Sequence, residues 1–253
     1  MTKLIKTPEE IARIRQSGKI LAKILRRLKN ESREGVKLIE LEELTKKLLR
    51  KEGAKPAFLN FRARGFRQKY PFALCTSVNE ILVHGRPSDY VLKSGDLLKL
   101  DLGVNWKKGF TDAAVTIPIG RVSKEGQRLI KLTRNALIEA IRVLKPGNTT
   151  GDIGFAIERV VNKWGAKIVE GLLIGHGVGV ALHEEPDIYH FKPGSGMVLK
   201  EGMVLAIEPM TSPTSAKVVQ MADDSFATSD GSISAHFEHT ILITGKGAEI
   251  LTE

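Results

Sequence analysis

Apolar residues recur at helical spacing in four stretches of the chain. The first stretch puts these residues on one helical face: Ile11, Ile14, Leu21, Ile24, Leu25 and Leu28. Just before it, Thr7-Pro8-Glu9-Glu10 combines a capping residue, a proline suited to the first turn and the glutamate of a capping box. The sequence therefore predicts a helix that begins after Thr7. Further helices are predicted over about 37–52, ended by Gly53, and over 123–145 and 150–164.

Strand-like segments follow each pair of predicted helices. Segments near 72–83, 97–104 and 110–118 are rich in Val, Ile, Leu and Thr and are separated by turn residues. From about 167 to the end of the chain, strands and turns alternate again. Helices followed by strands, twice in succession, indicate an α+β fold with two similar halves.

A short internal repeat supports this division into halves. VLKSGDLLKLD at 91–101 and VLKEGMVLAIE at 198–208 are identical at five of eleven positions. Upstream of each copy lies a histidine, proline and tyrosine triplet with one common spacing: His84, Pro87 and Tyr90, and His183, Pro186 and Tyr189. Two matches in the same order indicate an internal duplication. We expect one domain over 1–253, with halves of roughly 1–121 and 122–253.

The composition is typical of a globular protein with a substantial core. The chain has 253 residues, 42% of them apolar, and its N-terminal segment lacks the apolar centre of a signal peptide. No run approaches the roughly 18 apolar residues of a membrane span. A single cysteine, Cys75, excludes an internal disulfide framework and suits a reducing cytosol. We therefore expect a soluble, cytoplasmic protein without membrane attachment.

The net charge of +10 leaves two interpretations open. A basic surface serves solubility, or it attracts a polyanion such as RNA or a ribosome. Basic residues concentrate in NFRARGFRQKY at 60–70, where Arg62, Arg64, Arg67 and Lys69 are interleaved with aromatic residues. Such a mixture can grip single-stranded nucleic acid. A solvated loop whose aromatic side chains turn inward is the commoner arrangement.

Four carboxylates lie on apolar, strand-like segments: Asp101, Asp112, Glu208 and Glu238. Asp101 and Glu208 end the two copies of the repeat, so halves related by an approximate two-fold would bring them together in the interior. The alternation in SISAHFEHTILIT puts His236, Glu238 and Thr240 on one strand face. Taken singly, each acid is best interpreted as a strand-end or surface carboxylate.

Taken together, these acids indicate a metal site. An unpaired buried carboxylate is costly, so it is protonated, salt-bridged or bound to metal. The interior segments offer few lysines or arginines, whereas two divalent cations would balance four negative ligands. Carboxylates with one imidazole, that of the glycine-flanked His176, and no thiolate suit Mn, Fe, Co or Zn. Such a pair of ions activates water and polarises a carbonyl.

Six short motifs resemble, in their order, methionine aminopeptidases of the short, type I kind: HG at 84–85, DLG at 101–103, TD at 111–112, GHGVG…HEEP at 175–186, IEPM at 207–210 and FEHT at 237–240. The resemblance runs from about residue 7 to 253. It implies the pita-bread fold, in which two pseudo-symmetric halves form a curved antiparallel sheet covered by helices. It also implies removal of the N-terminal methionine from nascent proteins and peptides.

The resemblance implies a ligand set for two divalent ions: Asp101, Asp112, His176, Glu208 and Glu238. Asp112 and Glu238 would bridge the ions. Asp101 would bind one ion, and His176 with Glu208 the other. A hydroxide held between the ions would attack the first peptide bond, and Glu208 would shuttle its proton.

Substrate-contacting residues also follow from the resemblance. His183 would meet the carbonyl of the scissile bond, and His84 would contact its amide nitrogen and help the amine leave. The wall of the methionine pocket would comprise Tyr70, Cys75, Leu182, Phe58 and Phe61. An apolar, polarizable pocket suits a thioether. A small second residue is expected, because the ions and His84 would crowd the next subsite.

Two departures from the family pattern concern the surroundings of the site. His236 stands two residues before Glu238, where glutamine is more usual. No tryptophan occurs in MADDSFATSD at 221–230, where one often closes the pocket, and Phe226 is the candidate replacement. Neither departure removes a ligand.

Two alternative functions stay open. A peptidase of the same fold would cleave Xaa-Pro bonds, although such enzymes usually carry an added N-terminal domain for which this chain has no room. A non-enzymatic relative would use the basic face on RNA or ribosomes, but would be expected to lose ligands. The expected partners are a peptide or nascent-protein N-terminus and, through the basic surface, the ribosome. We expect a monomer.

Overall fold

The helices lie where the apolar periodicity predicts them. The computed structural model describes residues 4–62, 67–169, 173–192 and 195–253. Its helices are α1 (Pro8–Glu31), α2 (Leu38–Lys51), α3 (Lys124–Arg142) and α4 (Thr150–Lys163). The capping box of α1 is confirmed, since the Thr7 hydroxyl accepts from Glu10 N at 3.2 Å and the Glu10 carboxylate accepts from Thr7 N at 2.7 Å. Gly53, with φ of +62°, follows the end of α2 as predicted.

Strands occupy the segments between and after the helices, and their ladders are antiparallel. In chain order they are β1 (Lys55–Pro56), β2 (Cys75–Val78), β3 (Ile81–Val83), β4 (Leu97–Trp106), β5 (Gly109–Pro118), β6 (Lys167–Ile168), β7 (Gly175–Gly177), β8 (Glu184–Ile188), β9 (Val204–Ile207), β10 (Met210–Ser212), β11 (Val218–Gln220), β12 (Phe226–Thr228), β13 (Ala235–His236), β14 (His239–Thr244) and β15 (Gly247–Ile250). In one sheet, β4 pairs with β1, β2 and β5. A five-stranded sheet has the order β15-β14-β9-β7-β8.

The two halves of the chain repeat the same backbone contacts. Val91 bridges Lys37 just before α2, and Val198, its equivalent in the sequence repeat, bridges Thr149 just before α4. The turn glycines of the repeat also correspond. Gly95 N donates to Ile119 O, and Gly202 N donates to Ile243 O, both at 2.9 Å. The repeat therefore places corresponding strands, β4 and β9, at corresponding positions beneath corresponding helices.

An approximate two-fold relates the halves where β5 meets the segment before β14. Ala114 and Glu238 exchange both backbone hydrogen bonds, at 3.4 and 2.9 Å. On either side, the Thr240 hydroxyl bonds Asp112 N and O at 2.8 Å, and the Thr116 hydroxyl bonds His236 N at 2.9 Å and His236 O at 2.7 Å. These reciprocal bonds bring Asp112 and Glu238 to the centre of the molecule.

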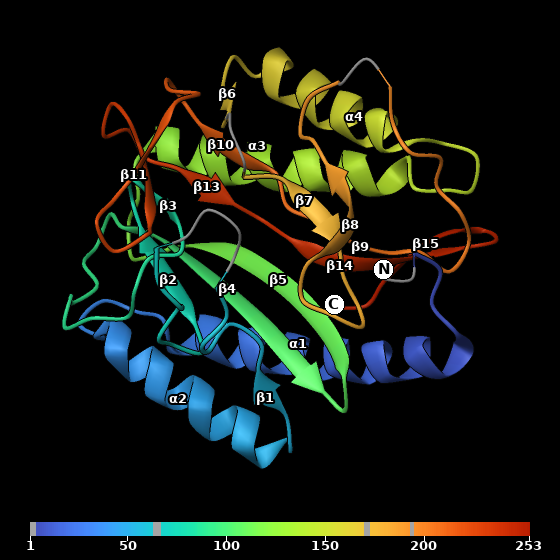
Figure 1. Ribbon diagram of the computed structural model, residues 1–253. Helices are drawn as coiled ribbons and strands as arrows, with labels where there is room; N and C mark the ends of the chain where they lie inside the picture. The colour runs from blue at the N-terminus through green and yellow to red at the C-terminus, as the bar shows by residue number, and fades with distance from the viewer. Residues whose placement is uncertain (1–3, 63–66, 170–172, 193–194) are drawn as a thin grey trace.

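Helices cover the sheets on the outside of both halves, as Figure 1 shows. In the lower half, α1 and α2 pack on β4 and β5 around a core that includes Leu21, Leu41 and Leu100. In the upper half, α3 and α4 pack on β9 and β14 around a core that includes Leu205 and Ile241. Curved antiparallel sheets under two helix pairs confirm the pita-bread architecture. Among the described helices, none combines the length and apolarity needed to cross a membrane.

One predicted strand is interrupted. The segment SISAHFEHTILIT contributes β13 to the sheet with β10 and β14 to the sheet with β9, with Phe237 and Glu238 between them. Alternation therefore does not run unbroken from His236 to Thr240. The interruption occurs where Glu238 N leaves its own ladder and donates to Ala114 O, so the break serves the junction between the halves.

Candidate metal centre

Strand register brings the first two carboxylates together. Asp101 on β4 pairs with Ala114, and Asp112 on β5 pairs with Gly103, so the two acids are diagonal neighbours on one face of the hairpin. The opposite half supplies the others. His176 lies on β7, Glu208 directly follows β9, and Glu238 directly precedes β14. Because β9 pairs with both β7 and β14, these three side chains reach the same region.

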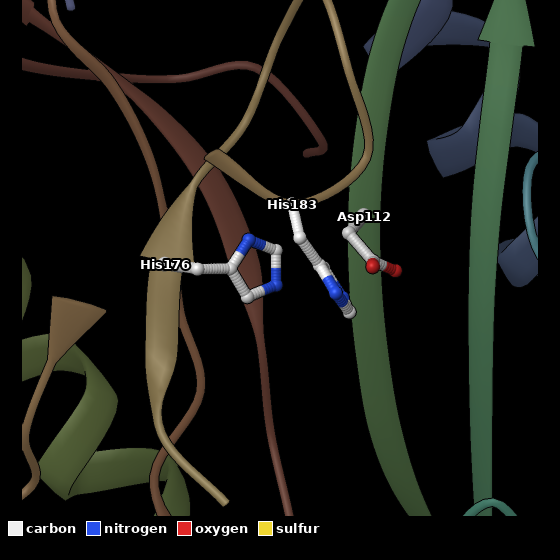
Figure 2. Close-up of side chains that lie close together, drawn as sticks. All are labelled: Asp112, His176 and His183. Atoms are coloured by element: carbon white, nitrogen blue, oxygen red, sulfur yellow. The ribbon is translucent and has the colours of Figure 1, made fainter. Parts of the chain in front are cut away.

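The predicted ligand positions converge. Ligand atoms of Asp101, Asp112 and Glu238 lie within 4.8 Å of one another, as do those of His176, Glu208 and Glu238. Glu238 is common to both groups. A third group joins Asp112, His176 and His183. In Figure 2, His183 reaches from the loop after β7 into the space between His176 and Asp112.

The four carboxylates are buried without cationic side chains to neutralise them. Their exposed fractions are 8% for Asp101, 4% for Asp112, 8% for Glu208 and 3% for Glu238. In the part of the chain that the structure describes, no lysine or arginine forms an ion pair with them, and the partners of Glu208 are the imidazoles of His176 and His236 at 3.5 and 3.6 Å. One oxygen each of Asp101 and Asp112 lacks a hydrogen-bond partner among these residues.

Burial and mutual repulsion hold protons on this cluster. Burial raises the pKa of Asp101 to about 7. It raises the pKa of Asp112 well above its usual range, and the charges of Glu238 and Asp101 raise it further. The pKa values of Glu208 and Glu238 are also raised well above their usual range, first by burial and then by neighbouring carboxylates. Bound cations would reverse this balance, which is the electrostatic signature of a metal site.

The protonation of His176 suits a metal ligand. Its Nδ1 lies 2.9 Å from Gly177 O, so this nitrogen carries the proton and donates it to the carbonyl. The lone pair of Nε2 is then directed toward Glu208, 3.5 Å away. Burial lowers the pKa of His176 to about 4, which keeps the ring neutral near pH 7. The residues present therefore fit divalent cations bound by oxygen and one imidazole nitrogen.

Two further histidines lie beside the cluster. The ring of His183 is 4.3 Å from that of His176 and 5.1 Å from that of Phe61. His84 has a φ of +57°, and its ring lies 5.9 Å from Phe226 in an edge-on contact. Burial, followed by the nearby His183, lowers the pKa of His84 to about 4. The proposed pocket-closing residue Phe226 thus lies against His84.

The predicted pocket residues form one apolar cluster beside the metal centre. Phe58, Cys75 and Leu182 are buried together, and Phe61 and Tyr70 pack against them. The Tyr70 hydroxyl donates to Leu74 O at 3.0 Å and to Gly85 O at 2.9 Å, which fixes the ring. Burial raises the pKa of the Cys75 thiol well above its usual range, so Cys75 stays protonated and suits a wall better than a nucleophile.

Sequence reasoning missed two members of this cluster, Ala57 and Phe110. Phe110 lies two residues before Asp112 on β5, so strand alternation alone puts both side chains on one face. That signal was available in the sequence. Ala57 is brought in by a contact that alternation does not reveal, because a Cβ at Gly103 would come within 2.9 Å of the Ala57 Cβ.

Two aromatic side chains of the basic segment 60–70, those of Phe61 and Tyr70, turn inward. Phe61 and Tyr70 pack on the apolar cluster, and Tyr70 N donates to Phe61 O at 2.8 Å. The structure therefore favours the solvated-loop interpretation of this segment. Two residues of this segment, Arg64 and Phe66, fall outside the described residues.

Comparisons with known proteins agree with this geometry. A family model described as metallopeptidase family M24 matches residues 12–245. Methionine aminopeptidase 1 of Bacillus subtilis (strain 168) is 39% identical over 251 residues, which are 98% of each chain. A crystal structure of methionine aminopeptidase from Thermotoga maritima covers the whole of both chains with a TM-score of 0.93 and 41% identity.

Longer peptidases share the fold less closely. Prolidase from Pyrococcus furiosus superimposes with a TM-score of 0.79 at 26% identity, and the match covers 99% of this chain but 65% of the prolidase. The family model spans most of the chain, and the relative from Bacillus subtilis matches it almost from end to end. The chain therefore belongs to metallopeptidase family M24.

Proposed function

We propose that this chain is a methionine aminopeptidase, which removes the N-terminal methionine from peptides and nascent proteins and prefers a small second residue. The observation that carries this proposal is the convergence of four buried carboxylates and the imidazole of His176 beside a cluster of apolar side chains. Full-length relatives named methionine aminopeptidase support it.

Five side chains would hold two divalent cations: Asp101, Asp112, His176, Glu208 and Glu238. Asp112, Glu238 and His176 each occur in two of the three groups of converging ligand atoms. Of these three, Asp112 and Glu238 are the bridging candidates, because a carboxylate has two oxygens to share between two ions and a neutral imidazole has one lone pair. Asp101 would complete one ion's site, and His176 with Glu208 the other's. Cobalt, manganese, iron and zinc all accept this donor set. When bound, such a pair supplies an activated water and polarises a carbonyl.

The protein residues around the ions would divide the remaining work. The apolar cluster of Phe58, Phe61, Tyr70, Cys75 and Leu182 would hold the methionine side chain. His183 would bind the carbonyl oxygen of the first peptide bond, and His84 would hold the amide nitrogen of the leaving amine. Glu208 would accept the proton of the attacking water and return it to the amine. The His84–Phe226 contact would limit space for the second residue.

The wider setting of this activity follows from the same proposal. We infer one catalytic domain over 1–253, whose two halves divide near residue 121, between β5 and α3. The partner would be a peptide or nascent-protein N-terminus in the cytoplasm. The net charge of +10 supports contact with a ribosome, and the enzyme would act as a monomer.

Chelation and substrate choice test this function. Activity on Met-Ala-Ser should vanish after chelation and return when one of Mn, Fe, Co or Zn is added back. Ala-Pro-Ala should be a poor substrate, whereas an Xaa-Pro peptidase would prefer it. A non-enzymatic RNA-binding relative would cleave neither peptide in any metal. Failure of every metal to restore Met-Ala-Ser hydrolysis would reject the proposal.

A further inference from the structure

The loop between β7 and β8 presents His183 and is packed against the N-terminal segment. Gly179 in this loop has a φ of +142°, and a Cβ there would meet Ile14 Cδ1 at 2.8 Å and Lys6 Cε at 2.9 Å. The carbonyl of Gly179 accepts from Phe110 N at 2.7 Å. Residues with a Cβ rarely adopt a φ of +142°, so the backbone conformation at this position favours glycine.

A buried ion pair closes the end of this loop. Glu184 directly follows His183, and its Oε1 accepts from Val180 N and Ala181 N, both at 2.7 Å. Its Oε2 accepts from the ammonium of Lys6. The side chains of Lys6 and Glu184 are 1% and 0% exposed. The carboxylate therefore satisfies two loop amides and one cation at a site without solvent, where a missing partner would be costly.

The backbone of Lys6 is itself held close to the start of β9. Lys6 N donates to Gly202 O at 2.9 Å, just before β9, which leads to Glu208. The next residue, Thr7, caps α1. The Lys6 side chain thus spans from a rigid helix start and the β9 turn to the loop that carries His183.

His183 has little else to fix its position. Its side chain is exposed, and within the described residues its ring contacts are with Phe61 and His176. Ring contacts at 4.3 and 5.1 Å do not define the direction of an imidazole nitrogen. The position of that nitrogen is then determined by the loop backbone, which Glu184 holds through its carboxylate.

We propose that the Lys6–Glu184 ion pair positions His183 for the peptide carbonyl, so that Lys6 and Glu184 act on the rate through that one imidazole. This inference rests on the proposed function for its kinetic readout. Among the described residues, Glu184 contributes no atom to the groups of converging ligand atoms. Both are positioning residues rather than catalytic ones.

A double-mutant cycle tests this role. Lys6→Met should lower kcat on Met-Ala-Ser on the order of tenfold, with little change in KM and unchanged metal content, because small misplacements of a reacting group are costly in rate. In a His183→Ala background, Lys6→Met should have no further effect on kcat, since its route of action is gone. Equal losses in both backgrounds, or full activity of Lys6→Met, would overturn the proposal.

Matched variants separate positioning from folding. Glu184→Gln keeps an acceptor for Val180 N and Ala181 N but loses the charge. Its kcat should therefore fall about as much as that of Lys6→Met, and it provides the test if Lys6→Met does not fold. Lys6→Arg retains the cation and should recover part of the rate. Lys23→Met breaks the exposed Lys23–Glu52 pair and should leave kcat unchanged. An unaffected Glu184→Gln enzyme would contradict the proposal.

A readout without turnover keeps this inference distinct from the proposed function. The chain has six histidines, so the ring signal of His183 can be assigned in the NMR spectrum by its loss in His183→Ala. Lys6→Met should shift or broaden that signal and speed hydrogen exchange at Val180 and Ala181, whereas Lys23→Met should not. These changes would support positioning even if Met-Ala-Ser proved not to be the substrate. An unchanged His183 signal would reject it.

Discussion

Two kinds of buried carboxylate occur in this molecule, and they differ in their partners. Glu42 on α2 is fully buried, yet it accepts from Ala73 N and Leu74 N at 3.0 Å and pairs with Lys46 at 3.1 Å. Glu184 has the same arrangement, with two loop amides and Lys6. In the candidate metal centre, by contrast, one oxygen each of Asp101 and Asp112 has no hydrogen-bond partner among the described residues, and Asp112 lies beside the acids Asp101 and Glu238.

This difference separates structural acids from acids that await a ligand. Glu42 and Glu184 each accept hydrogen bonds from two backbone amides of a loop and pair with a lysine, Lys46 and Lys6 respectively. The loop that Glu42 binds leads to Cys75, and the loop that Glu184 binds carries His183. Asp112 and Glu238 face other acids instead, and burial together with the charges of those acids raises their pKa values, so that they hold protons where no cation is bound. Burial alone therefore does not identify a functional acid. The absence of a protein cation and of hydrogen-bond donors does.

The largest test of this comparison is Asp112→Asn. Asp112 is a proposed bridging ligand, and a neutral amide cannot replace a bridging carboxylate, so we expect loss of at least one metal and a fall in kcat on the order of a hundredfold or more. Elemental analysis and Met-Ala-Ser hydrolysis measure both effects. Asp89→Asn serves as the control, because Asp89 is exposed to solvent and pairs with the exposed Lys37. Full turnover with two metals per Asp112→Asn chain would refute the ligand assignment.

A smaller effect is expected from His183→Ala. His183 lies beside the ligands but would act on the substrate, so the variant should bind both metals and lose rate, on the order of a hundredfold. Metal content by elemental analysis distinguishes this outcome from that of Asp112→Asn. Loss of a metal from His183→Ala would mean that the roles of His176 and His183 are exchanged. The test is needed because ligand atoms of both histidines converge with Asp112.

Glu42→Gln tests the structural side of the comparison. The amide leaves Lys46 without its buried partner and places an NH2 group near the amides of Ala73 and Leu74. We expect the free energy of unfolding to fall by about 2–3 kcal/mol. Metal content should not change, because no metal ligand is touched. Urea unfolding and elemental analysis check both points, and a variant that lost metal without losing stability would contradict the division.

Much of this arrangement could be predicted from the sequence because it depends on local or repeated patterns. Thr7 and Thr149 cap helices, and each capping box involves only the cap residue and the residue three positions later, so a short stretch of sequence is enough to locate the helix start. The repeat that ends in Asp101 and Glu208 indicates that the two acids meet at a two-fold. Asp112 and Glu238 could be recognised as candidates because both acids lie on apolar, strand-like segments, and the family resemblance implied that they bind the same ions.

Other features depend on contacts that leave no local trace. Lys6 and Glu184 are separated by 178 residues, and a lysine in a polar N-terminal segment is normally solvated. The break between β13 and β14 arises because Glu238 N pairs with Ala114 across the two-fold, whereas the local sequence alternates without interruption. Packing between distant segments determines both features, and the local sequence around each one does not predict it.

The smallest predicted effect is a pH dependence that distinguishes Glu238 from Glu42. Burial and the neighbouring Glu208 raise the pKa of Glu238 in the metal-free fold well above its ordinary value of 4.5. The folded state therefore holds this proton more tightly than the unfolded chain. Its contribution to stability is complete below pH 4.5 and is lost as pH rises through the raised pKa.

Glu238→Gln removes that loss. In chelator, the stability of Glu238→Gln relative to the parent chain should increase between pH 5 and pH 8, by at most about 1.4 kcal/mol per pH unit. Buried histidines and Lys99 titrate in both proteins, so their effects cancel in this difference. Glu42→Gln measured beside it separates the loss of a repelled acid from the loss of a paired one. Urea unfolding at each pH gives the result, and a difference that stays constant or shrinks with rising pH would show that Glu238 is already ionised without metal. The acids of the centre would then need no cation to remain charged, and the distinction between the two kinds of buried carboxylate would fail.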